Sequence, residues 1–233
     1  MTNLLSRFDF TETIVICAGE EQKEYLVHTN VLTTSSSKLL NRMVSNDWRE
    51  TREKRLRLPE TQPGVLEVYL HWMYTGNIIL GPEPADASTE CQVELYLLGD
   101  YLDDMTFCET IVEGLVELPC GSEHKLPSAT AVRLAWSKTS VDNPLRAVIK
   151  EIFLGVPIRS MVNAISNNGE FPYELIVDLL SALAENDKNY CKRSISRRSD
   201  AQIREACKGV VRSANQERFL STTSVQQAPA NDA

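Results

Sequence analysis

Two apolar stretches, residues 58–77 and 89–104, constrain the fold of this chain more than any other feature of its sequence. In the first, apolar side chains recur at the helical spacing i, i+3, i+4 and i+7, namely Leu66, Tyr69, Leu70 and Met73. Gly76 follows as a signal for the end of a helix. The second stretch is apolar almost all round, which is typical of a helix buried on most sides. We therefore expect two helices at the centre of a core.

The charge of the chain is unevenly distributed. Residues 188–233 hold nine Lys and Arg against four Asp and Glu, whereas residues 1–187 hold 15 against 28, and the whole chain has a formal net charge of −8. Phosphate contacts need clustered cations. The acidic balance therefore predicts that the folded part binds no nucleic acid.

The sequence predicts neither a signal peptide nor a membrane span. Its start, MTNLLSRFDF, has only a two-residue apolar pair before Ser6 and Arg7. No apolar run approaches the roughly 20 residues that a spanning helix needs. The six cysteines are scattered, several of them in apolar patterns, which favours reduced and mostly buried thiols. We expect a protein of the nucleus, the cytoplasm or both.

Three short segments are predicted to be strands. Residues 13–18 and 23–29 are β-rich and apolar, and the short charged connection beginning at Gly19 predicts a hairpin. Residues 55–58 alternate between polar and apolar, the pattern of a half-buried strand.

Helices are predicted between and after these strands. Ser35–Ser37 should divide the segment after the second strand into two short helices. Capping-box patterns predict that two later helices begin at Thr89, with Gln92 as partner, and at Thr106, with Glu109 as partner. Strands and helices in this order predict an α+β fold, with a small three-stranded sheet capped by a cluster of short helices.

This string of segments resembles the BTB/POZ domain over about residues 8–120. The runs EYLVHTNVLTTSSSKLLNRMV, RLRLPE, VLEVYLHWMYTGNI and LYLLGDYLDDMTFCETIVEGL resemble successive blocks of that family in the family's order, in spellings that resemble its fungal branch. The resemblance implies the BTB/POZ fold and a role in homo- or hetero-oligomerisation. It also implies signature positions that serve the fold, namely His28, Tyr74, Thr75 and Gly76.

Two features depart from the family pattern. Glu12-Thr13 stands where the family usually carries an Asp at the entrance of the first strand. The N-terminal segment is short, and some family members exchange an additional strand there between protomers. A homodimer formed by that exchange therefore stays an open alternative.

The resemblance also implies a partner-binding motif. BTB proteins that act as substrate adaptors of cullin-based ubiquitin ligases resemble one another in a hydrophobic-x-Glu motif before the third strand. Trp48-Arg49-Glu50 stands at the matching place, so Trp48 and Glu50 are the candidate partner-binding residues. In the alternative interpretation, Trp48 folds back on the adjacent helix and Glu50 is a solvated charge.

No pattern of catalytic or cofactor-binding residues occurs in the sequence. It contains neither a G-x-S-x-G elbow nor a glycine-rich phosphate loop. Cys108, Cys120 and His124 are the nearest approach to a set of zinc ligands, but they include no C-x-x-C pair. We therefore expect no metal, no cofactor and no enzymatic activity.

The second half of the chain predicts a helical extension over residues 121–187, packed on or beside the domain. Helices are expected at 128–138, from Asn143-Pro144 onward, and after Phe171-Pro172. The last of these is predicted to turn four apolar side chains inward, namely Ile176, Leu179, Leu180 and Leu183.

Residues 188–233 are predicted to form a disordered basic tail with a transient helix near 200–212, because large apolar residues become rare there. The run KRSISRR at 192–198 has the character of a nuclear import signal, or alternatively of a solubilising segment.

The sequence thus predicts a non-enzymatic protein–protein interaction module. Its expected partners are proteins, among them a second copy of the chain and a cullin scaffold for which it would be a substrate adaptor. The alternative is a nuclear scaffold or transcription-linked oligomerisation protein that does not bind a cullin.

Overall fold

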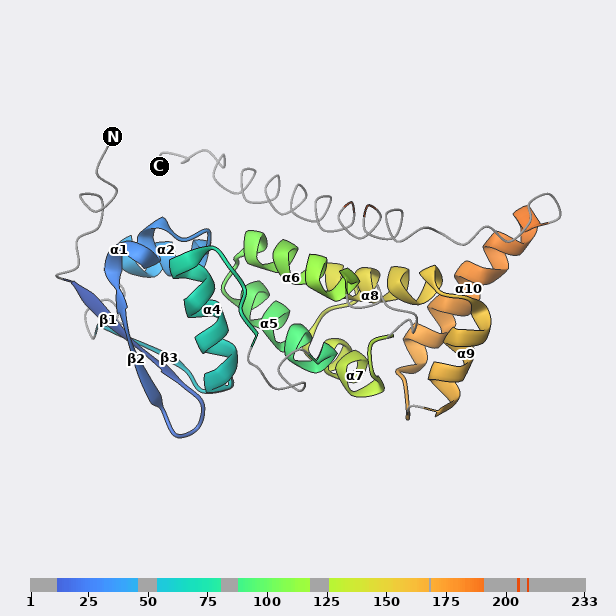
Figure 1. The fold of residues 1–233 in the computed structure, drawn as a ribbon, viewed down its shortest axis with the longest axis horizontal. Coiled ribbons are helices and arrows are strands. Elements are labelled where there is room, and N and C mark those ends of the chain that lie inside the picture. Colours follow the sequence, from blue (N-terminus) through green and yellow to red (C-terminus); the bar gives the residue numbers. More distant parts are fainter. Residues whose placement is uncertain are drawn as a thin grey trace, which may run out of the picture. The chain divides into compact units, whose positions relative to one another are not determined.

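The computed structural model describes residues 12–45, 54–80, 88–117, 126–167 and 169–190, together with residues 205 and 209. The chain divides into two compact units, Met1–Ile111 and Val112–Ala233 (Figure 1). The elements that begin in the first unit are β1 (Thr13–Ala18), β2 (Lys23–His28), α1 (Thr29–Thr34), α2 (Lys38–Ser45), β3 (Arg55–Leu58), α4 (Pro63–Thr75), α5 (Thr89–Tyr101) and α6 (Met105–Glu117), the last of which continues into the second unit.

A three-stranded sheet with the order β2-β1-β3 forms one layer of the first unit. Strands β1 and β2 make an antiparallel hairpin in which Thr13 lies opposite His28. Strand β3 joins β1 in parallel, with Val15 beside Arg55. The three predicted strands and the α+β class are confirmed, with the difference that Thr29 begins α1 instead of ending β2.

Helix α4 spans the sheet from end to end. At the hairpin end, Gly19 has a positive φ of 73°, and a Cβ there would lie 3.3 Å from the ring of Pro63 at the start of α4. At the other end, the hydroxyl of Tyr74 accepts a hydrogen bond from the backbone N–H of His28. Figure 1 shows α4 beside the strands, with α1 and α2 together near the His28 end.

An aromatic cluster joins α4 to α6 in the core of the first unit. The ring of Phe107 lies edge-on to that of Tyr69, with 4.9 Å between centroids, and its centroid is also 4.9 Å from that of Trp72. Gly99 of α5 makes room for this contact, because a Cβ at that position would lie 2.8 Å from a ring carbon of Phe107 and 2.9 Å from Cys108 Sγ.

The carboxylate of Asp104 is fully buried and accepts three hydrogen bonds. The donors are the hydroxyl of Ser36 at 2.7 Å, the hydroxyl of Tyr69 at 3.0 Å and the backbone N–H of Phe107 at 3.1 Å. The last of these caps the N-terminus of α6. Burial, followed by the charge of Asp104, raises the pKa of Tyr69 far above its ordinary value, so that its hydroxyl stays a donor.

Ser37 makes the neighbouring connection between distant segments. Its hydroxyl donates to the carbonyl of Leu102 at 2.6 Å and accepts from the N–H of Leu40 at 3.1 Å, which caps α2. The predicted break at Ser35–Ser37 is confirmed, and the structure adds that these serines hold α2 against the turn between α5 and α6.

Both predicted capping boxes were wrong by one or two residues. The cap of α5 is Ser88, whose side chain accepts from the N–H of Cys91 at 3.2 Å, and the cap of α6 is Asp104. In α5 the capping oxygen comes from the residue before the predicted Thr89, and in α6 it comes from the residue two positions before the predicted Thr106. Gln92 is instead buried, and its Oε1 has no hydrogen-bond partner among the described residues.

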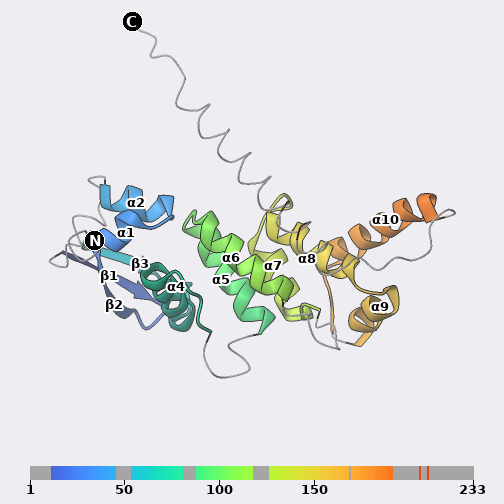
Figure 2. The ribbon, with the colours of Figure 1, turned by 45° about the horizontal axis from the view of Figure 1, so that its top comes forward.

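The second unit is helical in its described part. It contains α7 (Ala129–Lys138), α8 (Pro144–Gly155), α9 (Ile158–Asn167) and α10 (Tyr173–Tyr190). Helix α8 contacts the other three and lies between α7 and the α9–α10 pair (Figure 2). Its core side chains are fully buried, namely Leu145, Val148, Ile149 and Phe153. No helix of the described residues is long and apolar enough to cross a membrane.

Two features of this unit differ from the expectations. Helix α9 was not predicted, and it begins after Pro157, whose carbonyl accepts the N–H groups of Ser160 and Met161. On α10, Leu179 is buried as predicted and Ile176 and Leu183 are half-buried, but Leu180 is 61% exposed. Leu175, which was not expected to face inward, is fully buried, so the buried face of α10 is rotated towards Leu175.

Arg146 of α8 closes the end of α7. Its guanidinium donates to the carbonyls of Trp136, at 2.7 Å, and Thr139, and to the hydroxyl of Thr139 at 3.0 Å. The same group lies 5.2 Å from the centre of the Trp136 ring. Carbonyls in the last turn of a helix have no helical amide partner, and a cation there is favourable.

Asp104→Asn should lower the free energy of unfolding by about 2 kcal/mol, because the amide has one acceptor oxygen, whereas the three donors use both oxygens of the buried carboxylate. Denaturant unfolding measures this loss. Asp103→Asn is the matched control, since Asp103 is at the surface, has a positive φ of 51° that Asn tolerates, and should change stability by less than about 0.5 kcal/mol. Equal losses in the two variants would contradict the role of Asp104.

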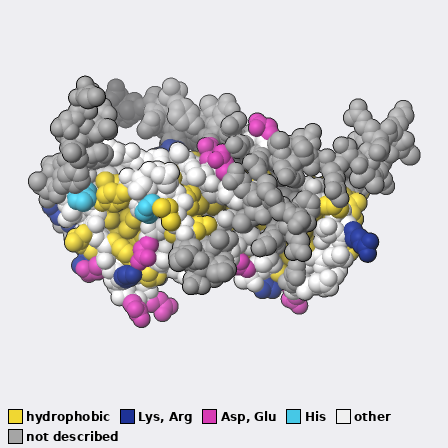
Figure 3. Space-filling model, in the orientation of Figure 1, with side chains coloured by type: hydrophobic (Ala, Val, Ile, Leu, Met, Phe, Trp, Pro, Cys, Tyr) yellow, Lys and Arg dark blue, Asp and Glu magenta, His cyan; other side chains and the backbone are white. Residues whose placement is uncertain are grey.

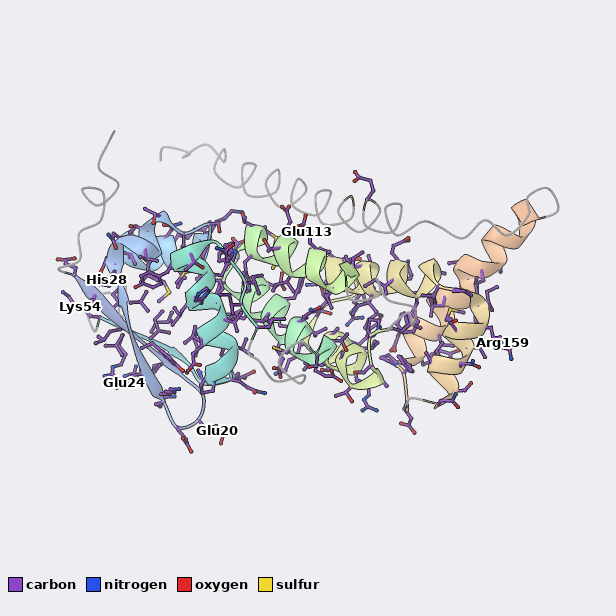
Figure 4. The ribbon with its side chains drawn as sticks, in the orientation of Figure 1. Glu20, Glu24, His28, Lys54, Glu113 and Arg159 are labelled. Carbon is purple, nitrogen blue, oxygen red and sulfur yellow. The ribbon has the colours of Figure 1, made fainter. Side chains whose placement is uncertain are left out.

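Arg146→Met should lower the free energy of unfolding by about 2 kcal/mol, because three acceptors at the end of α7 lose a charged donor. Arg159→Met is the control, because Arg159 is exposed on α9 (Figure 4). If thermal unfolding finds the two variants equally stable, Arg146 does not hold α7 to α8.

Candidate interaction surface

Two of the signature residues meet at one end of the sheet. His28 ends β2, and Tyr74 lies in the last turn of α4. The hydroxyl of Tyr74 is 3.1 Å from the backbone nitrogen of His28 and 2.8 Å from its Nδ1, and the two rings meet edge-on. The oxygen of the Tyr74 hydroxyl accepts the backbone N–H, so the hydroxyl proton is free to point at Nδ1. Nδ1 accepts that hydrogen bond when the imidazole carries its proton on Nε2.

The other two signature residues end α4. Thr75 donates its hydroxyl to the carbonyl of His71 at 2.8 Å and accepts the N–H of Asn77 at 3.1 Å. Gly76 has a positive φ of 72°, and its N–H donates to the carbonyl of Trp72 at 2.7 Å. A residue without a side chain is favoured at such a position. The Tyr-Thr-Gly run thus stops the helix and fixes Tyr74 beside His28.

Trp48 and Glu50 lie outside the described residues, in the segment 46–53, but the residues on both sides of that segment are described. Helix α2 ends at Ser45. On the other side, the carbonyl of Lys54 accepts the N–H of Val15 at 2.9 Å. The strand register places Lys54 at the same end of the sheet as His28, and Figure 4 shows the two labelled residues near each other.

Apolar side chains are exposed on the first unit, which sequence reasoning did not identify. The exposed large ones are Leu26, Tyr74, Ile79 and Tyr101. Figure 3 shows apolar side chains around the two described histidines. Tyr74 lies in the last turn of α4 and Ile79 in the segment after it. The end of the unit at which His28 and Lys54 lie therefore also offers apolar surface.

Charged side chains occupy the hairpin and the outer face of the sheet. Glu67 of α4 accepts from Lys23 at 2.7 Å and from the hydroxyl of Tyr25 at 2.8 Å, and these two hydrogen bonds, the first above all, lower the pKa of Glu67. Arg55 donates to Glu24 at 2.6 Å. These pairs are exposed to solvent, so they contribute little to stability.

The described residues offer no arrangement for metal chemistry, since no three His, Cys, Asp or Glu side chains among them lie close enough to hold an ion. Of the suggested zinc ligands, Cys108 is buried with its Sγ 3.6 Å from the carbonyl of Tyr96. Cys120 and His124 lie outside the described residues. What the described surface offers is contact area and hydrogen bonds, which suit binding.

Tyr74→Phe should lower the free energy of unfolding by about 1 kcal/mol, because the N–H of His28 loses its acceptor. Hydrogen exchange at the His28 amide should accelerate, which NMR measures residue by residue. Tyr101→Phe is the control, because Tyr101 is an exposed tyrosine of the same unit. Unchanged exchange at His28 would show that the hydroxyl does not hold this end of the sheet.

Comparison with known proteins agrees with this architecture. The family model of the BTB/POZ domain matches residues 2–109, which include the whole sheet, α4 and α5. A search among curated proteins found no match. With its three-stranded mixed sheet, its helices and this match, the chain carries a BTB/POZ domain, a module of protein–protein interaction.

Proposed function

We propose that this BTB/POZ domain binds a cullin scaffold through residues 46–53 and so acts as a substrate adaptor of a ubiquitin ligase. The supporting observation is the place of this segment between two anchored elements. Its eight residues follow the end of α2 and precede Lys54, the residue before β3, and both α2 and β3 are anchored in the first unit. Trp48, Arg49 and Glu50 stand in its first half.

The anchors on either side favour tight binding by residues 46–53. Ser37 ties the start of α2 to Leu102, and the carbonyl of Lys54 accepts a hydrogen bond from Val15 of the central strand. A segment with fixed ends loses less conformational entropy on binding than a free segment. Trp and Arg are also the residue types that most often dominate the binding energy of an interface.

A second candidate function is oligomerisation without a cullin, as in a nuclear scaffold or a transcription-linked protein. The exposed Tyr74 and Ile79 favour it, because they offer apolar surface for a second copy at the His28 end of the first unit. The basic run at 192–198 supports a nuclear location, and the cytoplasm is the alternative. In either candidate the chain contributes binding and no catalytic step of its own.

Binding to the N-terminal domain of a cullin tests the first candidate. The unmutated chain should bind, and Trp48→Ala should raise Kd about thirtyfold, the effect of losing a hot spot of about 2 kcal/mol. Glu50→Ala should also weaken binding. Calorimetry or a quantitative pull-down measures both.

Glu20→Ala is the matched control for Glu50→Ala, because Glu20 is an exposed glutamate in the hairpin turn, far from Lys54 in Figure 4. It should bind as tightly as the unmutated chain. Absence of binding by the unmutated chain would end the adaptor proposal. A dimer in light scattering that binds no cullin would support the second candidate instead.

A further inference from the structure

The outward side of α10 carries a line of apolar side chains that nothing in the described part of the chain covers. Tyr173, Val177 and Leu180 are 76%, 38% and 61% exposed, and Ala184 is exposed as well. Their spacing of i, i+4, i+7 and i+11 places them on one face of the helix. We call these four residues the α10 stripe. The opposite face of α10, with Leu175 and Leu179, is buried.

One flank of the α10 stripe is acidic. Glu174 and Asp178 are exposed, and each comes directly after a residue of the α10 stripe. One position along a helix corresponds to a rotation of about 100°, so both carboxylates lie on the same side of the stripe. An occupant of the stripe therefore needs an apolar line of matching spacing with a basic flank.

Residues 203–214 of the same chain have that pattern. Ile203, Cys207, Val210 and Ala214 repeat the spacing i, i+4, i+7 and i+11, and each of the first two is followed by a cation, Arg204 and Lys208. Arg212 continues the basic flank. The two described residues of this segment, Glu205 and Gly209, are helical and exposed. In a helix they lie on the side opposite the apolar line.

We propose that residues 201–214 dock as an antiparallel helix on the α10 stripe. Helix α10 ends at Tyr190, and the ten residues from 191 to 200 are enough to reverse the chain into a helical hairpin. In both helices the charged flank lies about 100° around the axis from the apolar line, in the same rotational direction. When two such helices pack antiparallel through their apolar lines, these flanks lie on the same side of the pair, so the cations of the segment face the acids of α10. Residues at equal distances from the connection at 191–200 lie opposite each other in such a hairpin. Cys207 therefore faces Ala184, and Arg212 lies beside Asp178.

Charge also favours this occupant over a second copy of α10. Two α10 helices packed antiparallel through their stripes would bring their acidic flanks, with Glu174 and Asp178, against each other. Like charges in such positions are destabilising. The segment from 188 to 233 carries nine Lys and Arg against four Asp and Glu, so its net charge is opposite to that of the flank.

Disulfide formation in the full-length chain tests the docking. Ala184→Cys is introduced in a background in which Cys91, Cys120 and Cys191 are replaced by Ser, and diamide is added as the oxidant. The new thiol should form an intramolecular disulfide with Cys207, because a disulfide needs Cα atoms within about 7 Å of each other. Mass spectrometry after proteolysis identifies the bond, and a non-reducing gel gives its rate.

Tyr173→Cys in the same background is the matched control. Tyr173 belongs to the same stripe and is also exposed, but it lies about 16 Å further along α10. Its disulfide with Cys207 should form at least about tenfold more slowly, because the docked register separates the two positions. Equal rates for the two positions would overturn the proposal, and so would a cross-linked product of twice the mass, which would assign the stripe to a second copy.

A charge exchange tests the register independently. Asp178→Lys should slow the disulfide of Ala184→Cys roughly threefold, and adding Arg212→Asp should restore the rate. Circular dichroism of each variant checks that the helices are retained. Failure of the second change to restore the rate would overturn the pairing of the two flanks. Cullin binding is not a readout here, so these results are independent of the adaptor proposal.

Discussion

The first unit depends on one buried carboxylate. Asp104 begins α6, yet its oxygens also take hydrogen bonds from the segment before α2 and from the middle of α4. A buried charge is tolerated only where several donors replace the water it has lost. Ser36, Tyr69 and Phe107 provide them, and each comes from a different part of the chain. This one side chain therefore joins α6 to α4 and to the segment before α2, in addition to the contacts made by Ser37 and the aromatic cluster.

That constraint explains which features the sequence predicted and which it did not. The β-rich apolar run was enough for β1, alternation was enough for β3, and Gly76 was enough for the end of α4, because these signals act within a few residues. The capping oxygens of α5 and α6 were assigned one or two residues late. The role of Asp104 was missed, since it depends on Ser36 and Tyr69, which are distant in the sequence.

The surfaces were also harder to predict than the core, because their residues meet only in the folded chain. His28 and Tyr74 are distant in the sequence, and no local pattern indicates their contact, although the family resemblance named both. Leu180 was expected inside together with Leu179, but it is exposed, and the buried face of α10 carries Leu175 and Leu179. The exposed Leu180 belongs to an apolar spacing that residues 203–214 repeat, and the match becomes visible in the sequence only when the buried face of α10 is known.

The parallel pairing of β3 with β1 has a mechanical consequence for a partner bound at residues 46–53. A force applied there acts on β3 on one side and on α2 on the other. Strand β3 has four residues and is held along one edge only, by β1, in the described sheet. Helix α2 is held through Ser37 and the turn after α5. The force would thus be shared between a short row of strand hydrogen bonds and the contacts of a helix. It would reach β2 only through β1.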